Sequence, residues 1–189
     1  MQKKRLGLFV LIAALFLVLS ACSEEKEETA DAEKVEHTDG TGHENMDMSS
    51  SGEIPEGLKE AENPTFEVGS KAIIESDHMA GMKGAEATIV GAYSTTVYAI
   101  SYTPTNGGDK VDNHKWVIHE ELIDAGDEPL APGEEAKTDA SHMEGMADAT
   151  VTIDTAEDTT VYMVDFTTTD GQEVKNHKWV TESELSPVK

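Results

Sequence analysis

A five-residue motif with the ligands of a copper site occurs twice in this sequence. The motif His-Met-x-Gly-Met begins at His78 and again 64 residues later at His142. A methionine thioether is a soft ligand that favours Cu(I), and it has no proton to lose at physiological pH. The glycine permits a positive φ angle, so two methionines spaced by three can point to one side of a compact loop, beside the imidazole. The predicted copper ligands are His78, Met79, Met82, His142, Met143 and Met146.

An alternative interpretation of the motif is structural. Methionine adapts to irregular gaps, so both methionines could fill the end of a hydrophobic core while the histidine stays exposed. Neighbouring positions differ between the two copies, with Lys83 and Gly84 replaced by Ala147 and Asp148, whereas the His, both Met and the Gly are identical. Common descent explains part of this identity, and the remainder favours metal binding.

A second motif, Asn-His-Lys-Trp, occupies residues 113–116 and 176–179. Its histidine and tryptophan are two residues apart, so on a strand they share one face. His114 and His177 are therefore either half-buried side chains held by a backbone carbonyl or further metal ligands beside the methionine loops. Residue spacing leaves both interpretations open.

Further histidines and methionines lie near the N-terminus. A flexible chain can wrap a copper ion without a preformed pocket, at an entropic cost that lowers affinity. The weaker candidate ligands of this group are His37, His43, Met46 and Met48. His119 receives no role, because Glu182 occupies the equivalent position in the second copy.

Several classes of function are excluded by what the sequence lacks. The single cysteine, Cys22, rules out a disulfide framework, a Cys-rich zinc site and a Cys-x-x-Cys redox pair. No nucleophile elbow, His-Glu-x-x-His motif or Gly-rich phosphate loop is present, so we do not expect an enzyme. With 38 acidic and 14 basic residues, the formal charge of -24 repels phosphate backbones, and nucleic acid is not an expected partner.

The N-terminus has the pattern of an exported lipoprotein. Three basic residues precede an apolar run over residues 6–19, which is typical of a signal peptide spanning residues 1–21. The sequence Leu-Ser-Ala-Cys ending at Cys22 resembles a lipobox, in which the cysteine carries the lipid, such as palmitate, and anchors the protein to the membrane; the alternative is a secreted protein with a free thiol. Signal removal takes away three of the 14 basic residues and no acidic one, leaving a formal charge of -27 and no arginine.

The remaining chain divides into a polar segment and a tandem repeat. Residues 22–53 are acidic and nearly free of branched and aromatic side chains, so we expect a disordered tether. Residues 54–123 and 124–189 then contain the two copies of the motifs. Each copy predicts short strands. Within residues 96–102, alternation with a period of two places Tyr98, Ile100 and Tyr102 on one buried face. A separate, preceding strand is expected to cover Ala87 and Ile89. The predicted fold is mostly β, with two tandem small SH3-like barrels.

Together, the two motifs and the lipobox resemble the YdhK-type, CopL-like copper-binding lipoproteins of Gram-positive bacteria. This resemblance implies a non-enzymatic protein, lipid-anchored at the outer face of the cell membrane, that binds copper and limits copper toxicity. We expect sequestration of copper, with Cu(I) preferred over Cu(II). Two alternatives stay open: a metallochaperone that delivers copper to an exporter or a multicopper oxidase, and a cell-wall or protein-interaction module.

Overall fold

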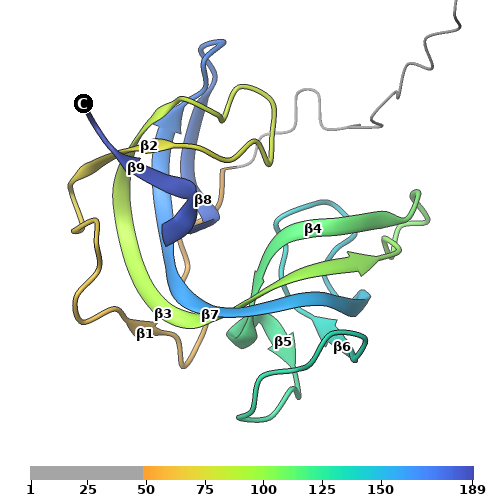
Figure 1. Ribbon diagram of the computed structural model, residues 1–189. Coiled ribbons are helices and arrows are strands. Elements are labelled where there is room, and N and C mark those ends of the chain that lie inside the picture. The colour runs from red at the N-terminus through yellow and green to blue at the C-terminus, as the bar shows by residue number, and fades with distance from the viewer. Residues whose placement is uncertain (1–48) are drawn as a thin grey trace, which may run out of the picture. The chain divides into compact units, whose positions relative to one another are not determined.

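The computed structural model describes residues 49–189, which form nine strands and two short 3₁₀ helices (Figure 1). The strands are β1 (Lys59–Glu60), β2 (Lys71–Ile74), β3 (Glu86–Tyr102), β4 (Val111–Ile118), β5 (Leu122–Ile123), β6 (Glu135–Thr138), β7 (Thr150–Thr167), β8 (Glu173–Thr181) and β9 (Leu185–Pro187). The helices are η1 (His119–Glu121) and η2 (Glu182–Glu184). Within residues 49–189, no helix has the length and apolar character needed to cross a membrane. The predicted signal peptide, Cys22 and most of the predicted tether lie outside the described residues.

All nine strands belong to one open antiparallel sheet. The central path runs β5-β6-β7-β3-β2-β9, with β1 and β4 also paired to β3, and β8 paired to β7. The expectation of two closed barrels is therefore wrong. The strands of one repeat do not close into a barrel by themselves, because the longest strand of the first repeat, β3, pairs with the longest strand of the second, β7. That pairing extends from Ala87 opposite Phe166 to Tyr102 opposite Val151.

The long strands differ from the predicted pattern of short ones. Sequence analysis places separate strands around residues 87–89 and 96–102, whereas β3 is continuous over 17 residues. The segment between them, residues 90–95, has no proline and a single glycine, Gly91, so nothing in it requires a turn. Gly91 lies at a shift in the β3–β7 register, which bends the strand without ending it.

The hydrophobic cores show that the two repeats exchange their halves. The first core combines the early part of repeat one with the late part of repeat two, and the second core combines the late part of repeat one with the early part of repeat two (Figure 1). A third cluster, which includes Trp116 and Trp179, also draws residues from both repeats. The first core contains Phe66, Ala72, Ile74, Met79, Met82, Ala85, Ala87, Ile89, Ala92, Tyr162, Val164, Phe166, Val174, Val180 and Leu185. The second core contains Tyr98, Ile100, Tyr102, Val117, Leu122, Ala140, Met146, Ala149, Val151 and Ile153. The sequence boundary between residues 123 and 124 is therefore not a boundary between cores.

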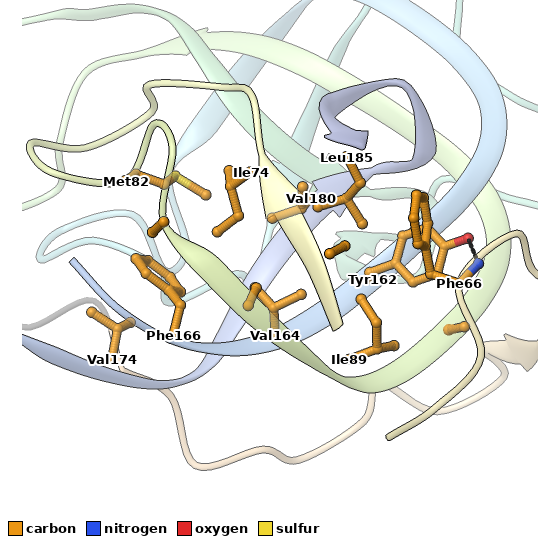
Figure 2. Close-up of a cluster of buried hydrophobic side chains, with 14 of the residues drawn as sticks. Phe66, Ile74, Met82, Ile89, Tyr162, Val164, Phe166, Val174, Val180 and Leu185 are labelled. Atoms are coloured by element: carbon orange, nitrogen blue, oxygen red, sulfur yellow. Dashed lines mark hydrogen bonds between the residues drawn. The ribbon is translucent and has the colours of Figure 1, made fainter. Parts of the chain in front are cut away.

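The predicted buried face of the central strand is confirmed. Tyr98 and Ile100 are fully buried and Tyr102 is 2% exposed. Their counterparts in β7 lie in the first core, where the backbone N–H of Phe66 donates to the Tyr162 hydroxyl at 3.3 Å (Figure 2). In the second core, the Tyr98 hydroxyl accepts from the Leu130 backbone N–H at 3.1 Å, so the central tyrosine of each core has a hydrogen-bond partner inside the protein.

Residues 49–53, the last part of the predicted tether, dock on β8. The backbone N–H of Ser50 donates to the Lys175 carbonyl at 2.9 Å, and its hydroxyl donates to the Asn176 carbonyl at 2.6 Å. The Ser49 hydroxyl accepts from the Lys175 backbone N–H at 3.0 Å. These bonds hold the segment that precedes the first repeat against a strand of the second.

Candidate metal-binding site

Four of the six predicted loop ligands line one small cavity. His78 and Met79 come from the loop between β2 and β3, and His142 and Met143 come from the equivalent loop between β6 and β7. The cavity has a volume of about 20 Å³, which is enough for about one water-sized particle. Its other lining residues are His114 and Lys115 of β4, and His177 and Lys178 of β8. Strand exchange thus brings the histidine-methionine pairs of both repeats to one place.

On one side of the cavity, His78 is fixed by a carboxylate from the other repeat. Its Nε2 lies 2.7 Å from Oε1 of Glu184. The second carboxylate oxygen accepts from the Trp116 indole N–H at 2.9 Å and from the Thr181 backbone N–H at 3.0 Å. Both oxygens of this carboxylate are therefore occupied by donors.

The opposite side repeats this arrangement with the roles of the repeats reversed. His142 Nε2 lies 2.9 Å from Oε1 of Glu121. The other oxygen accepts from the Trp179 indole N–H at 3.1 Å and from the Ile118 backbone N–H at 3.2 Å. Each histidine is thus held by a glutamate of the partner repeat, and each glutamate is held by a tryptophan.

The second nitrogen of each ring has the character of a metal ligand. Nδ1 of His78 and Nδ1 of His142 are buried and make no hydrogen bond. When a neutral imidazole donates its Nε2 proton to a carboxylate, Nδ1 keeps a lone pair. Metal-bound histidines in proteins very commonly donate their other N–H to a carboxylate in this way. In this neutral form each ring has a buried Nδ1 lone pair, and both histidines line the same cavity.

The glutamates remain charged despite their burial. Burial alone raises the pKa of the Glu121 carboxyl, but attraction to His142 and the three hydrogen bonds above hold the pKa below its usual value. Burial also raises the pKa of Glu184, and the hydrogen bond and attraction to His78, together with the Thr181 and Trp116 donors, lower it overall. An ionised carboxylate is the acceptor that keeps the imidazole proton on Nε2.

The four loop methionines separate into two groups. Met79 is 7% exposed and Met143 is partly buried, and both line the cavity. The Tyr102 hydroxyl donates to the Met143 sulfur at 3.8 Å. In contrast, Met82 and Met146 are fully buried, the first among the side chains shown in Figure 2 and the second in the second core. The structure does not bring Met82 and Met146 to the cavity.

The glycine of each motif has a structural requirement. Gly81 has a φ of +74° and Gly145 a φ of +78°, which L side chains rarely adopt. A Cβ at Gly145 would lie 2.8 Å from the Asn106 side chain, and one at Gly81 would lie 2.9 Å from Asp170. Each motif loop therefore packs against the strand-connecting turn that completes the same core.

The histidines of β4 and β8 also line the cavity. His114 has its ring centroid 6.3 Å from that of His142, with the ring planes tilted by 41°. His177 is 3% exposed and contacts Phe166 edge-on at 5.6 Å between centroids. Both histidines lie beside the motif loops, as they must if they are further metal ligands. Their rings also pack on aromatic side chains, as expected of structural histidines.

The glutamates that orient the rings were not among the predicted site residues. Glu121 and Glu184 each follow a repeated tryptophan by five residues and precede a leucine, so the signal was their recurrence. His119 was also assigned no role, and its Nδ1 lies 2.8 Å from the Tyr98 hydroxyl. Glu182, at the equivalent position, accepts from the Tyr162 hydroxyl at 2.9 Å. Both residues satisfy a buried tyrosine and lie away from the cavity lining.

Histidine and carboxylate side chains alone do not form a metal site in the described part of the chain. Within residues 49–189, no group of three or more His, Cys, Asp or Glu side chains is arranged to hold a metal ion. The weaker candidates His37, His43, Met46 and Met48, and the proposed lipid attachment point Cys22, lie outside the described residues.

Known proteins share both repeats and the fold. Residues 68–119 and 132–182 each match the family described as protein of unknown function, DUF1541. The YdhK protein of Bacillus subtilis (strain 168) is 57% identical over 190 residues, covering 98% of this chain and 91% of the relative. A crystal structure of YdhK, 62% identical, superposes with a TM-score of 0.74 and covers 77% of this chain and 100% of that one. A solution structure of the YdhK C-terminal domain is 65% identical, has a TM-score of 0.62, and covers 64% of this chain and 92% of that one. The chain therefore belongs to the DUF1541 family.

Proposed function

We propose that this protein is a non-catalytic copper-binding lipoprotein that sequesters Cu(I) in preference to Cu(II) at the outer face of the cell membrane. The lipid on Cys22 anchors it there, and capture of copper before uptake limits copper toxicity. The observation that carries this proposal is the cavity in which His78, Met79, His142 and Met143 converge. Each imidazole in it keeps a buried Nδ1 without a hydrogen bond while a carboxylate holds its Nε2.

The donor set favours a soft cation. Thioethers and neutral imidazoles suit Cu(I), whereas Ca²⁺ and Mg²⁺ need oxygen ligands. Each oxygen of the two nearby carboxylates already accepts a hydrogen bond from His, Trp or a backbone N–H. The cavity therefore offers nitrogen and sulfur ligands, with its acidic groups placed behind the imidazoles.

Of the six motif residues first predicted as ligands, four remain in the proposed site. The two repeats share one site made of two histidine-methionine pairs, while Met82 and Met146 serve the cores. His114 and His177 are the next candidates, because they line the same cavity. The N-terminal His37, His43, Met46 and Met48 add weaker binding.

A competition titration tests the ligand set. The full chain in detergent is titrated anaerobically with Cu(I) against bathocuproine disulfonate, which reports the copper left to the chelator. We expect Met79→Leu/Met143→Leu to lose the tight site, since leucine conserves volume but has no sulfur. The matched control, Met82→Leu/Met146→Leu, should retain it. A variant with alanine at all four N-terminal positions separates that segment's contribution.

The opposite pattern would refute the shared site. If the Met82→Leu/Met146→Leu variant lost copper and the Met79→Leu/Met143→Leu variant kept it, the methionines in the cores would be the ligands. If all variants bound as much copper as the wild type, neither set of methionines would be required.

A further inference from the structure

An acidic groove lies next to the candidate site, on the side of His142. The groove has a volume of about 710 Å³ and shares His142 and Lys178 with the small cavity. It is lined by five carboxylates and one basic side chain, Lys178. The carboxylates belong to Glu53, Glu56, Glu120, Glu121 and Asp139.

Two of these carboxylates lie on the segment docked on β8 or shortly after it. Glu53 is the last residue of the docked segment, after the serine that bonds to Lys175 and Asn176, and Glu56 follows it at the start of the first repeat. Asp139 lies on the opposite chain segment, three residues before His142. Glu53, Glu56 and Asp139 are exposed, and no ion pair within residues 49–189 neutralises any of the three.

The groove borders one of the proposed ligands, His142. The side chain of His142 is 7% exposed, and its Nδ1 is buried without a hydrogen bond. A cation in the groove therefore lies next to His142, which is the one proposed ligand that lines both the groove and the cavity among residues 49–189. Clefts lined by charge of one sign raise the local concentration of the opposite ion and increase its association rate.

We propose that this groove is the access route by which the metal cation reaches the cavity, an inference that rests on the proposed function. Carboxylate oxygens are hard ligands, so they attract a soft cation by charge but do not compete with imidazole and thioether for it. The groove thus accelerates capture and does not hold the metal. Its carboxylates set the association rate, while the cavity sets the dissociation rate.

Stopped-flow kinetics with Ag⁺ tests this assignment. Ag⁺ is a soft d¹⁰ monovalent cation like Cu⁺, and silver nitrate in chloride-free buffer avoids oxidation during mixing. The fluorescence of Trp116 and Trp179 reports binding, because their indoles bond to the glutamates that hold the two histidines. The full chain in a nonionic detergent is used throughout, at low and at physiological ionic strength.

Two triple variants with the same change in net charge are compared. Glu53→Gln/Glu56→Gln/Asp139→Asn removes the three exposed carboxylates of the groove. Glu62→Gln/Glu67→Gln/Glu128→Gln removes three exposed carboxylates that do not line it. At low ionic strength we expect the groove variant to associate roughly tenfold more slowly than the control variant, with a smaller difference at physiological salt. Dissociation, measured by a chase with thiosulfate, should be unchanged.

The possible failures are distinguishable. A wild-type chain that does not bind Ag⁺ overturns the proposed function and the access route with it. A wild-type chain that binds Ag⁺, with equal association rates in the two triple variants, overturns the access route alone. Faster dissociation from the groove variant would also overturn it, because the carboxylates would then be retaining the metal.

Discussion

Replacing Glu121 by glutamine should weaken copper binding by changing which nitrogen of His142 carries the proton. In the wild type, the carboxylate accepts from His142 Nε2 on one oxygen and from Trp179 and Ile118 on the other. Glutamine has a single acceptor oxygen. If that oxygen keeps the Trp179 and Ile118 donors, the amide NH₂ faces Nε2, which must then accept a hydrogen bond. The imidazole proton moves to Nδ1, and the lone pair proposed to bind copper is lost.

The expected loss follows from the behaviour of residues that orient metal ligands. Changing a carboxylate behind a metal-bound histidine typically costs 10- to 100-fold in affinity, or about 1.4–2.7 kcal/mol. Loss of the charged acceptor in a buried site also lowers the free energy of unfolding by about 1–3 kcal/mol. Glu184→Gln should act in the same direction on His78, with a smaller stability loss because its side chain is 14% exposed rather than 6%.

Two measurements separate this mechanism from simple destabilisation. Cu(I) affinity comes from competition with bathocuproine disulfonate, with Glu128→Gln as the exposed control. The proton position comes from ¹⁵N chemical shifts of the imidazole rings, which differ between the two tautomers. A folded Glu121→Gln chain with unchanged Cu(I) affinity, or with the His142 proton still on Nε2, would refute the proposed role of the glutamate.

Three further outcomes are expected. Gly145→Ala should lower the free energy of unfolding by about 1–3 kcal/mol, and by more than Gly133→Ala does. Both glycines have a positive φ, but only the Gly145 substitution brings a Cβ 2.8 Å from Asn106. Urea denaturation that gives the two variants similar stability would contradict this prediction. Burial, with the hydrogen bond to a neighbouring carboxylate, raises the pKa of Tyr162 to about 12 from an ordinary 10.0. Because the unfolded phenol ionises first, its contribution to stability is complete below pH 10 and is lost between pH 10 and about 12; absorbance titration of the folded chain at 295 nm that ionises every tyrosine near pH 10 would disprove it. Finally, residues 124–189 alone should form a dimer, since each core needs halves from two repeats; a well-folded monomer by light scattering would show that one repeat can close on itself.

The sequence was sufficient to predict the repeat, the β class and one buried face of the central strands. Period-two alternation around Tyr98 and Tyr162 identified one buried face, and both side chains are fully buried. It did not predict that Val97 and Ala99, on the opposite face, are buried as well. Strand exchange was not predictable, because a strand that pairs within its own repeat and one that pairs with the other repeat have the same alternation. The two copies are also nearly equivalent in pattern, so the periodicity cannot tell one partner from the other.

The ligand set was predictable only in part for a similar reason. In a loop, spacing three allows two methionines to point to one side but does not require it. Met79 and Met143 line the cavity, although Met79 also belongs to the first core, whereas Met82 and Met146 lie in the cores and do not line the cavity. The identity of the motif in both copies therefore has two causes, a structural one for the glycine and second methionine and a proposed chemical one for the first two residues.

Exchange of halves also links the candidate site to the assembly of the fold. His78 is held by Glu184 and His142 by Glu121, so each imidazole is oriented by the repeat that does not contain it. A lone repeat carries one histidine and one glutamate that meet partners only in a second copy. A metal that binds the paired arrangement and not the separate chains stabilises it by about 2.7 kcal/mol at 100 times its Kd. Cu(I) should therefore strengthen the dimer formed by residues 124–189, and it should fail to do so when His142 is replaced by alanine.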